Sequence, residues 1–432
     1  MAIVAPKNST ITTSSEPTSY SVPLAVVTTL FFMWGFLTCL NDILVPHLKP
    51  IFDLNYTEIM LIQFAFFGAY FVFSIPSAKI IDWIGYQRSM VVGLMTMGVG
   101  AFLFVPAASV PSYPLFLIAL IVLAAGITCL QVAANPYVTV LGKPETASSR
   151  LNLTQAFNSL GTFLAPFFGG LLILSAAPKT MTEIRALAPD ALQAYRLHEA
   201  SSVKLPYVGL GVALVLLAVV IGSFKLPKIE HAQHRVGEKV TDSIWNHPNL
   251  IFGAIGIFVY VGAEVSIGSF LVNYFSQPDI GGLTEKAAAS FVAFYWGGAM
   301  VGRFIGSGLL QKIKTGHLLG ICAVCAAALV TISMISTGHF AMWSIILVGF
   351  FNSIMFPSIF TLGVAELGPL TGDGSGVLIM AIVGGAIIPL AQGAIADRLG
   401  IHHAFFLPVI CYLYILYFAL IGSRPNSERA RP

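Results

Sequence analysis

The sequence predicts an all-α membrane protein with twelve transmembrane helices, arranged as two halves of six. Two observations lead to this prediction: the composition, and matching residues placed about half a chain apart. Of the 432 residues, 56% are hydrophobic and 9% are charged, and the mean hydropathy is +0.85. Soluble domains carry roughly 25% charged residues, so a chain this apolar requires a bilayer as its solvent. The net charge of +3 is too small to indicate a nucleic-acid partner.

Twelve apolar stretches of about 20 residues are separated by polar residues, glycine or proline. A tail rich in Ser, Thr and Pro, residues 1–20, is expected to be disordered and precedes the N-terminal half, 21–226. The expected spans of this half are 21–46, 58–81, 89–108, 115–139, 151–176 and 205–226. A polar linker, 227–247, leads to the C-terminal half, 248–422, and residues 423–432 form a second tail. The expected spans of the second half are 248–275, 287–311, 315–336, 340–366, 375–396 and 402–422.

The basic residues predict the orientation of the chain. With the N-terminus inside, fifteen of the 22 Lys and Arg residues fall on the cytoplasmic side. Four of the other seven lie in one long outer loop, 177–204, where the charge bias matters less. The positive-inside rule therefore places both termini in the cytoplasm.

The two halves of the chain resemble one another. Three pairs of matching residues lie at offsets of 221, 222 and 223: Pro136 with Pro357, Asp42 with Glu264, and Gly161 with Gly384. One such pair can arise by coincidence, but three at nearly one offset indicate a parallel 6+6 repeat. In transporters built this way the substrate site lies near the membrane midplane, between the repeats.

Two acids lie where the predicted spans can least accommodate them. Asp42 stands between the apolar runs 22–40 and 43–45, and Glu264 stands inside the run 250–275. A charge inside a span costs about 2.5–3.5 kcal/mol on insertion scales, so intramembrane acids usually face a cavity and mark a substrate or ion pathway. One such acid in each half predicts a coupled transporter.

Amide side chains gather on the fourth and fifth spans. Gln131 and Asn135 share one helix face, and Asn152, Gln155 and Asn158 follow at intervals of three. Each amide could be satisfied by a neighbouring helix at about 0.6 kcal/mol per bond, but five of them favour a polar cavity. Such a cavity suits a neutral sugar, whose hydroxyls both donate and accept. Four aromatic residues of the spans could complete the site or simply pack: Trp34, Phe67, Trp296 and Phe356.

Four segments resemble the fucose:proton symporter family of the major facilitator superfamily, which includes bacterial fucose, glucose/galactose and N-acetylglucosamine permeases. These are 40–46 (LNDILVP), 133–136 (AANP) continuing to 140–142 (VLG), 150–159 (RLNLTQAFNS) and 260–263 (YVGA). The resemblance covers about residues 20–420. It implies the major facilitator fold, sugar transport by alternating access, and a multi-pass monomer in a bacterial inner membrane.

The resemblance also implies individual roles. Asp42 would be the cation-coupling acid, and Gln155 and Asn158 would contact sugar. The complete set of predicted substrate-binding residues is Asn41, Gln131, Asn135, Gln155, Asn158 and Glu264. Fucose permeases have a glutamate where this chain has Gln131 and an amide where it has Glu264. These departures favour a glucose/galactose-type hexose, with fucose and N-acetylglucosamine as alternatives.

The resemblance favours protons as the coupling ion, with sodium as the alternative. A proton or a bound sodium ion would neutralise Asp42 and let the halves rock across the sugar. Asn41, Asp42 and Gln131 could offer oxygen ligands to sodium; no cofactor or other metal is expected. A passive channel is disfavoured by the repeat and its two acids. A membrane enzyme is disfavoured because the sequence has no intramembrane His pair, G-x-S-x-G or P-loop.

Two further roles are left open by the sequence. Glu264 could accept sugar hydroxyls or form an ion pair with Arg303 on the next span, and the first is favoured because Arg303 lies near the cytoplasmic end. The loop between spans two and three, with Asp82 and Arg88, resembles the major facilitator loop signature. Its acid and base would tie helix ends together in one conformation, which is a gating role.

Overall fold

A computed structural model describes residues 20–52, 56–110, 112–173, 183–184, 186–227 and 242–424. The predicted tails, apart from residues 20, 423 and 424, and most of the predicted linker lie outside these residues. The regular elements of the described ranges are all helical.

In the described ranges, the first half has five long helices. They are α1 (Ser21–Phe52), α2 (Tyr56–Ser109), α3 (Tyr113–Val140), α4 (Ala147–Ile173), which follows the short η1 (Pro144–Thr146), and α6 (Pro189–Ser223). The predicted second and third spans both belong to α2, and Gly85 separates them with φ 81° and ψ 167°. Glycine adopts this conformation without the steric cost that a Cβ would bring, so the chain reverses there without a loop.

The second half is more divided. After η3 (Ile244–Asn246) come α7 (Pro248–Phe275), α8 (Glu285–Leu309) and α9 (Thr315–Ile335). Each of the last three spans is built from pieces: α10 (Gly338–Asn352) with α11 (Met355–Gly363); η4 (Gly368–Leu370), α12 (Thr371–Met380), η5 (Ala381–Val383) and α13 (Gly384–Leu399); and α14 (Ile401–Ala404), α15 (Phe406–Tyr417) and η6 (Phe418–Gly422).

These helices account for twelve crossings. Ten described stretches are long and apolar enough to span a membrane. One of them, Leu61–Ser109, has 49 residues, about twice the ~20 residues that one crossing needs, and Gly85 divides it in two. α4 supplies the twelfth span, so the predicted fold class is confirmed.

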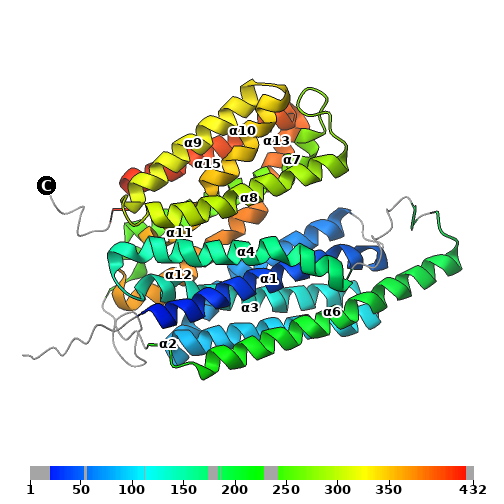
Figure 1. Ribbon diagram of the computed structural model, residues 1–432, viewed down its shortest axis with the longest axis horizontal. Helices are drawn as coiled ribbons and strands as arrows, with labels where there is room; N and C mark the ends of the chain where they lie inside the picture. Colours follow the sequence, from blue (N-terminus) through cyan, green and yellow to red (C-terminus); the bar gives the residue numbers. More distant parts are fainter. Residues whose placement is uncertain are drawn as a thin grey trace, which may run out of the picture.

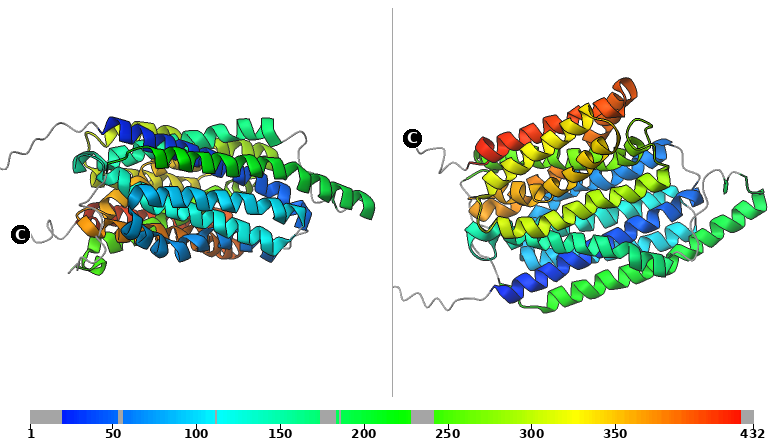
Figure 2. Two further views of the ribbon diagram at one scale, coloured as in Figure 1. Left: turned by 90° about the horizontal axis from the view of Figure 1, so that it is seen from below. Right: turned by 45° about the horizontal axis from the view of Figure 1, so that its top comes forward.

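The two halves lie side by side with their helices roughly aligned. In Figure 1 most of the first half (blue to green) lies below and most of the second half (green to red) above, and α4 and α8 meet at the boundary. α12 of the second half is drawn among the helices of the first half. α2 crosses the boundary to pack on α12, and α4 also contacts α11. α6 projects beyond the other helices at one end of the bundle (Figure 2).

The repeated glycines make equivalent contacts in the two halves. A Cβ at Gly161 would stand 2.2 Å from the carbonyl oxygen of Phe32, so α4 approaches α1 backbone to backbone. A Cβ at Gly384 would stand 2.0 Å from the carbonyl oxygen of Phe258, so α13 approaches α7 in the same way. Small residues permit such close helix approach within membranes. The repeat read from the sequence is therefore also a repeat of packing.

A repeated proline leaves one backbone carbonyl inside α3 without its helical hydrogen bond. Pro136 has no N–H, so the carbonyl of Val132, four residues earlier, lacks its helical partner. Ser375 of α12 donates to that carbonyl at 2.8 Å, and the bond joins the two halves.

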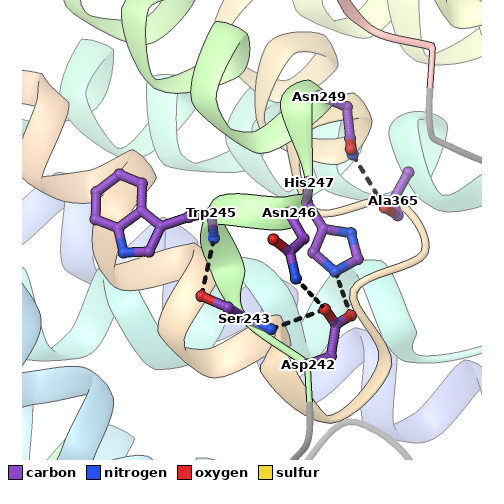
Figure 3. A network of polar contacts seen from close by, with 7 residues as sticks. All are labelled: Asp242, Ser243, Trp245, Asn246, His247, Asn249 and Ala365. Carbon is purple, nitrogen blue, oxygen red and sulfur yellow. Dashed lines mark hydrogen bonds and ion pairs between the residues drawn. The ribbon is translucent and has the colours of Figure 1, made fainter.

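The start of the second half is fixed by a polar network (Figure 3). Asp242 accepts hydrogen bonds from three groups: the Ser243 N–H (2.8 Å), Asn246 Nδ2 (3.0 Å) and His247 Nε2 (2.8 Å). These bonds hold the pKa of the Asp242 carboxyl below its usual range, with the bond from Asn246 the largest cause. In the first turn of α7, Asn249 donates to the carbonyl of Ala365 at 3.0 Å and so connects α7 to the end of α11.

Candidate functional site

A cavity of about 110 Å³ lies within the first half, where α1, α2, α3 and α4 meet. Its lining residues are Trp34, Gly35, Thr38, Cys39, Tyr70, Ile127, Asn158 and Thr162. One predicted sugar-binding residue, Asn158, and one candidate aromatic, Trp34, therefore lie at one cavity. Tyr70 was missed by sequence reasoning, although a tyrosine within an apolar span signals a hydroxyl that needs a partner.

The predicted coupling acid belongs to α1. Asn41 and Asp42 lie on this helix, but their side chains are outside the described part of the structure, so their roles stay predictions. Position 42 follows Thr38 by about one helical turn. The Thr38 hydroxyl oxygen is buried, has no hydrogen-bond partner among the described residues, and belongs to a residue that lines the cavity.

Gln131 stands behind the cavity wall. It is 7% exposed and donates through Nε2 to the hydroxyl of Tyr70 at 2.8 Å. α3 is buried continuously over residues 126–139, which places both of its amides inside the protein instead of against lipid. Gln131 thus reaches the cavity through Tyr70.

Gln155 and Asn135 form an amide pair between α4 and α3. Gln155 Nε2 donates to Asn135 Oδ1 at 3.3 Å, and Gln155 is 7% exposed. Asn135 is fully buried, and its Nδ2 has no partner among the described residues. An unpaired buried donor costs about 1–3 kcal/mol, so Asn135 is a group that gains if a partner reaches it.

Asn158 and Asn152 point in different directions although they share one helix. Asn158 Nδ2 donates to the Phe31 carbonyl at 2.9 Å, which holds α4 against α1 beside the cavity. Asn152 Nδ2 instead donates across the boundary to the Arg303 carbonyl of α8 at 2.7 Å. The amide stripe seen in the sequence therefore serves two surfaces, the cavity and the contact between halves.

Four buried hydroxyls and one half-buried hydroxyl join the two halves at the end of the bundle where α4 begins and α11 ends. Ser148 lies 2.6 Å from the Thr361 hydroxyl and accepts from Thr315 at 2.8 Å. Ser149 donates to the Ser307 carbonyl at 2.8 Å. We call Ser148, Ser149, Ser307, Thr315 and Thr361 the hydroxyl clasp.

An ion pair lies between the same two halves. Lys79 of α2 is 2.8 Å from Asp373 in the first turn of α12, and 3.5 Å from Asp82 of its own helix. A tie between helix ends is therefore made by Lys79 and Asp373, two residues that the loop signature did not indicate. The gating role of Asp82 with Arg88 stays a prediction.

The second half presents Glu264 from α7. Its Oε1 accepts a hydrogen bond from the Tyr260 hydroxyl at 2.8 Å. Among the residues that the structure describes, no ion pair within 4.0 Å joins Glu264 to Arg303. Sugar binding by Glu264 stays a prediction, and so does its ion pair with Arg303, for which the described part of the structure shows no direct contact.

Arg303 is directed to the boundary. Pro357 lacks the N–H that would bond the Ser353 carbonyl, and Arg303 Nε donates to that oxygen at 3.3 Å. Its guanidinium also donates to the hydroxyl of Ser159, on α4 of the first half. The second proline of the repeat thus positions an arginine that bridges the halves beside Asn158.

The remaining candidate aromatics do not gather at the cavity. Phe67, 9% exposed, lies between the halves, with its ring edge 2.6 Å from the position a Cβ would take at Gly385. Trp296 is 46% exposed, and Phe356 stacks on Phe360 with ring centroids 6.1 Å apart.

Comparisons with known proteins identify what the chain resembles. The family model described as Major Facilitator Superfamily matches residues 25–382. A Brucella abortus protein named glucose/galactose transporter is 54% identical over 425 residues, which cover 98% of this chain and 100% of the relative. An Escherichia coli protein named L-fucose-proton symporter is 35% identical over 426 residues, which cover 96% of each chain.

Solved structures of a fucose:proton symporter are also similar. A crystal structure of a variant of the E. coli symporter FucP matches with a TM-score of 0.85 and 33% identity, covering 94% of this chain and 100% of that chain. A structure of FucP described as in the outward conformation matches with a TM-score of 0.86 and 34% identity, covering 94% and 99%.

Proposed function

The chain belongs to the Major Facilitator Superfamily, and on that basis we propose that it carries a glucose- or galactose-type hexose together with a cation. The family resemblance predicted from the sequence is confirmed. The main support for the substrate is the full-length likeness to a relative named glucose/galactose transporter. The cavity is lined by one amide, three hydroxyls and one indole, which is the chemistry that a neutral polyol requires.

Asp42 is the proposed coupling acid. An empty carrier holds it charged, which is costly while the cavity closes around it in a low dielectric. A cation neutralises it, and the halves can then rock across the loaded site. Because sugar and cation favour the same closed state, each strengthens the binding of the other.

Protons are the preferred coupling ion. Support comes from the relative named L-fucose-proton symporter and from the likeness to the fucose:proton symporter structure. Sodium is the alternative, with oxygen ligands from Asn41, Asp42 and Gln131. Gln131 donates its Nε2 to Tyr70, which leaves its Oε1 as the atom that could bind a cation.

The structure fits an outward-facing state of a bacterial inner-membrane protein. The hydroxyl clasp and the Lys79–Asp373 pair hold the halves together at one end. The positive-inside rule makes this end cytoplasmic, since it also carries the basic connections between spans. The likeness to a FucP structure described as outward supports the same reading.

The test is uptake of labelled glucose and galactose into proteoliposomes with imposed gradients. Accumulation above equilibrium under a proton gradient, competed by unlabelled hexose, is the expected result. Equal accumulation driven by sodium alone would make sodium the coupling ion instead of the proton. Competition by fucose or N-acetylglucosamine alone would make that sugar the substrate instead of glucose or galactose. Equilibration without accumulation under either gradient would leave a passive channel and contradict coupled transport.

A further inference from the structure

A polar network surrounds the half-buried Glu264, and the mechanism above does not use it. Tyr260, one turn earlier on α7 and 1% exposed, donates to Glu264 Oε1 at 2.8 Å. The same hydroxyl lies 3.1 Å from the backbone oxygen of Asn352, the last residue of α10. A phenol carries one hydrogen, so Tyr260 can donate to one of these acceptors at a time.

One hydrogen and two acceptors suit two protonation states of Glu264. While Glu264 is charged, its oxygen takes the hydrogen of Tyr260. When Glu264 carries a proton, the carboxylic acid can donate to the Tyr260 oxygen, and Tyr260 turns its own hydrogen to the Asn352 carbonyl. Glu264 and Tyr260 are hydrogen-bonded to each other in both states, so the carboxyl group and the phenol keep a partner whichever form is present.

Glu264 lacks direct compensation of its charge. The ionisable groups that act on it come from its own helix and from two neighbours: Tyr260 on α7, Tyr295 and Arg303 on α8, and Tyr412 on α15. Arg303 is the charged one, and in the described ranges it is not within ion-pair distance of Glu264. Glu264 is half-buried. A half-buried carboxylate without a salt-bridge partner is still costly, and binding a proton removes that cost.

The network also reaches the boundary between the halves. Asn352, whose carbonyl faces Tyr260, is followed by Ser353, whose carbonyl accepts from Arg303 at 3.3 Å. Arg303 in turn donates to Ser159 of the first half. Glu264 is therefore linked to Arg303, which bridges the halves, through Tyr260 and the adjacent carbonyls of Asn352 and Ser353.

We propose that Glu264 is a second proton-carrying site, located in the C-terminal half, and that Tyr260 is the positioning residue that accommodates both of its states. The proposal rests on the proposed transport function. A proton from water binds a carboxylate oxygen of Glu264, and the Tyr260 hydrogen rotates from Oε1 to the Asn352 carbonyl. No covalent bond of Tyr260 breaks, and release of the proton reverses the rotation.

Infrared difference spectra of the purified protein test this proposal as the pH is stepped between about 5 and 9. We expect a titrating carboxyl band in the wild type that Glu264→Gln abolishes. Tyr260→Phe retains the ring but removes the donor to the charged form, so the midpoint of that band should move to higher pH by about 1–2 units. Tyr274→Phe is the matched control, because Tyr274 is equally buried on α7 but donates to the Ser333 carbonyl at 3.0 Å.

Two results would overturn the proposal. One is a carboxyl titration that is the same in wild type and Glu264→Gln. The other is a titration midpoint that is the same in Tyr260→Phe and Tyr274→Phe. This result would show that Tyr260 is not the positioning residue, and it can be obtained even if Glu264→Gln fails to fold. The spectra do not depend on uptake, so a wild type that titrates but moves no hexose contradicts the proposed function alone.

Discussion

At the level of single residues, the candidate site combines groups exposed to the cavity with groups that support them. Asn158 lines the cavity while its Nδ2 is bonded to the Phe31 carbonyl, whereas Gln131 acts through the hydroxyl of Tyr70. Substitutions at these positions should therefore differ in their effects on binding and on stability.

Asp42→Asn should abolish gradient-driven accumulation while leaving exchange of labelled for unlabelled sugar. A permanently neutral side chain imitates the loaded carrier, which can rock but cannot couple to an ion gradient. Counterflow and uphill uptake are measured in the same proteoliposomes. Wild-type accumulation by this variant would remove Asp42 as the coupling acid.

Gln155→Ala and Asn158→Ala should each weaken hexose affinity by roughly 5- to 150-fold, which corresponds to about 1–3 kcal/mol for a lost buried hydrogen bond. Gln87→Ala is the matched control for Asn158→Ala, because Gln87 also bonds a helix carbonyl, that of Ile221 at 2.9 Å, but does not line the cavity. Affinity by calorimetry and thermal stability in detergent are both measured. Unchanged affinity with a lowered melting temperature would make the amides structural.

At the level of helices and turns, close helix pairs and helix starts determine which segments are rigid. Gly384 allows α13 to touch the backbone of α7, and Asp242 fixes the turn that leads into α7. These two features can be tested separately, because one lies inside the bundle and the other is exposed.

Gly384→Ala should destabilise the protein, by about 1–3 kcal/mol as for other overpacked sites, because the new Cβ would stand 2.0 Å from the Phe258 carbonyl oxygen. Gly297→Ala is the control, since nothing lies within 4 Å of a Cβ at that position. Thermal unfolding in one detergent compares them. Equal melting temperatures for the two variants would show that α7 and α13 can separate at little cost.

The turn into α7 should loosen in acid. The hydrogen bonds from Asn246, His247 and Ser243 lower the folded-state pKa of Asp242, so their stabilisation is present above its unfolded pKa. It is lost as the pH falls through the lowered, folded value. Hydrogen exchange of residues 243–250 should accelerate in that range in the wild type, whereas Asp242→Asn should exchange faster already at neutral pH. Identical profiles for both proteins would contradict this role.

At the level of the complete transporter, the halves are joined at one end by the hydroxyl clasp, the Lys79–Asp373 pair and the Asn152–Arg303 bond. In alternating access these contacts must part in each cycle. An exposed ion pair contributes only about 0–1 kcal/mol, so the buried hydroxyls are expected to contribute more to keeping this end closed.

A disulfide across the clasp should lock the carrier. The Ser148 and Thr361 hydroxyls lie 2.6 Å apart, so Ser148→Cys with Thr361→Cys should cross-link on oxidation. The variant is made without the five native thiols. Transport should stop on oxidation and return on reduction, while hexose binding persists, and Ser148→Cys alone provides the control. Unimpeded transport by the cross-linked protein would mean that this end does not open.

The fold class, the twelve spans and the repeat could all be predicted from the sequence. Apolar length and punctuation are local properties that a bilayer enforces on every segment, because backbone groups in lipid must be paired within a helix. The repeated prolines and glycines could also be located, because their effects are local. Proline, for example, acts on a carbonyl four residues away in its own helix.

The meeting of particular polar side chains depends instead on how the helices pack. Asn152 and Asn158 look alike in the sequence, yet one contacts Arg303 across the boundary and the other lines the cavity. The sequence suggests Arg303 as a partner for Glu264, but Arg303 donates to Ser159 and to the Ser353 carbonyl. The hydroxyl of Tyr260 donates to the Glu264 carboxylate instead. Such pairings depend on the rotation and depth of helices packed against one another, and helical periodicity along one segment does not specify the neighbour that a face will meet.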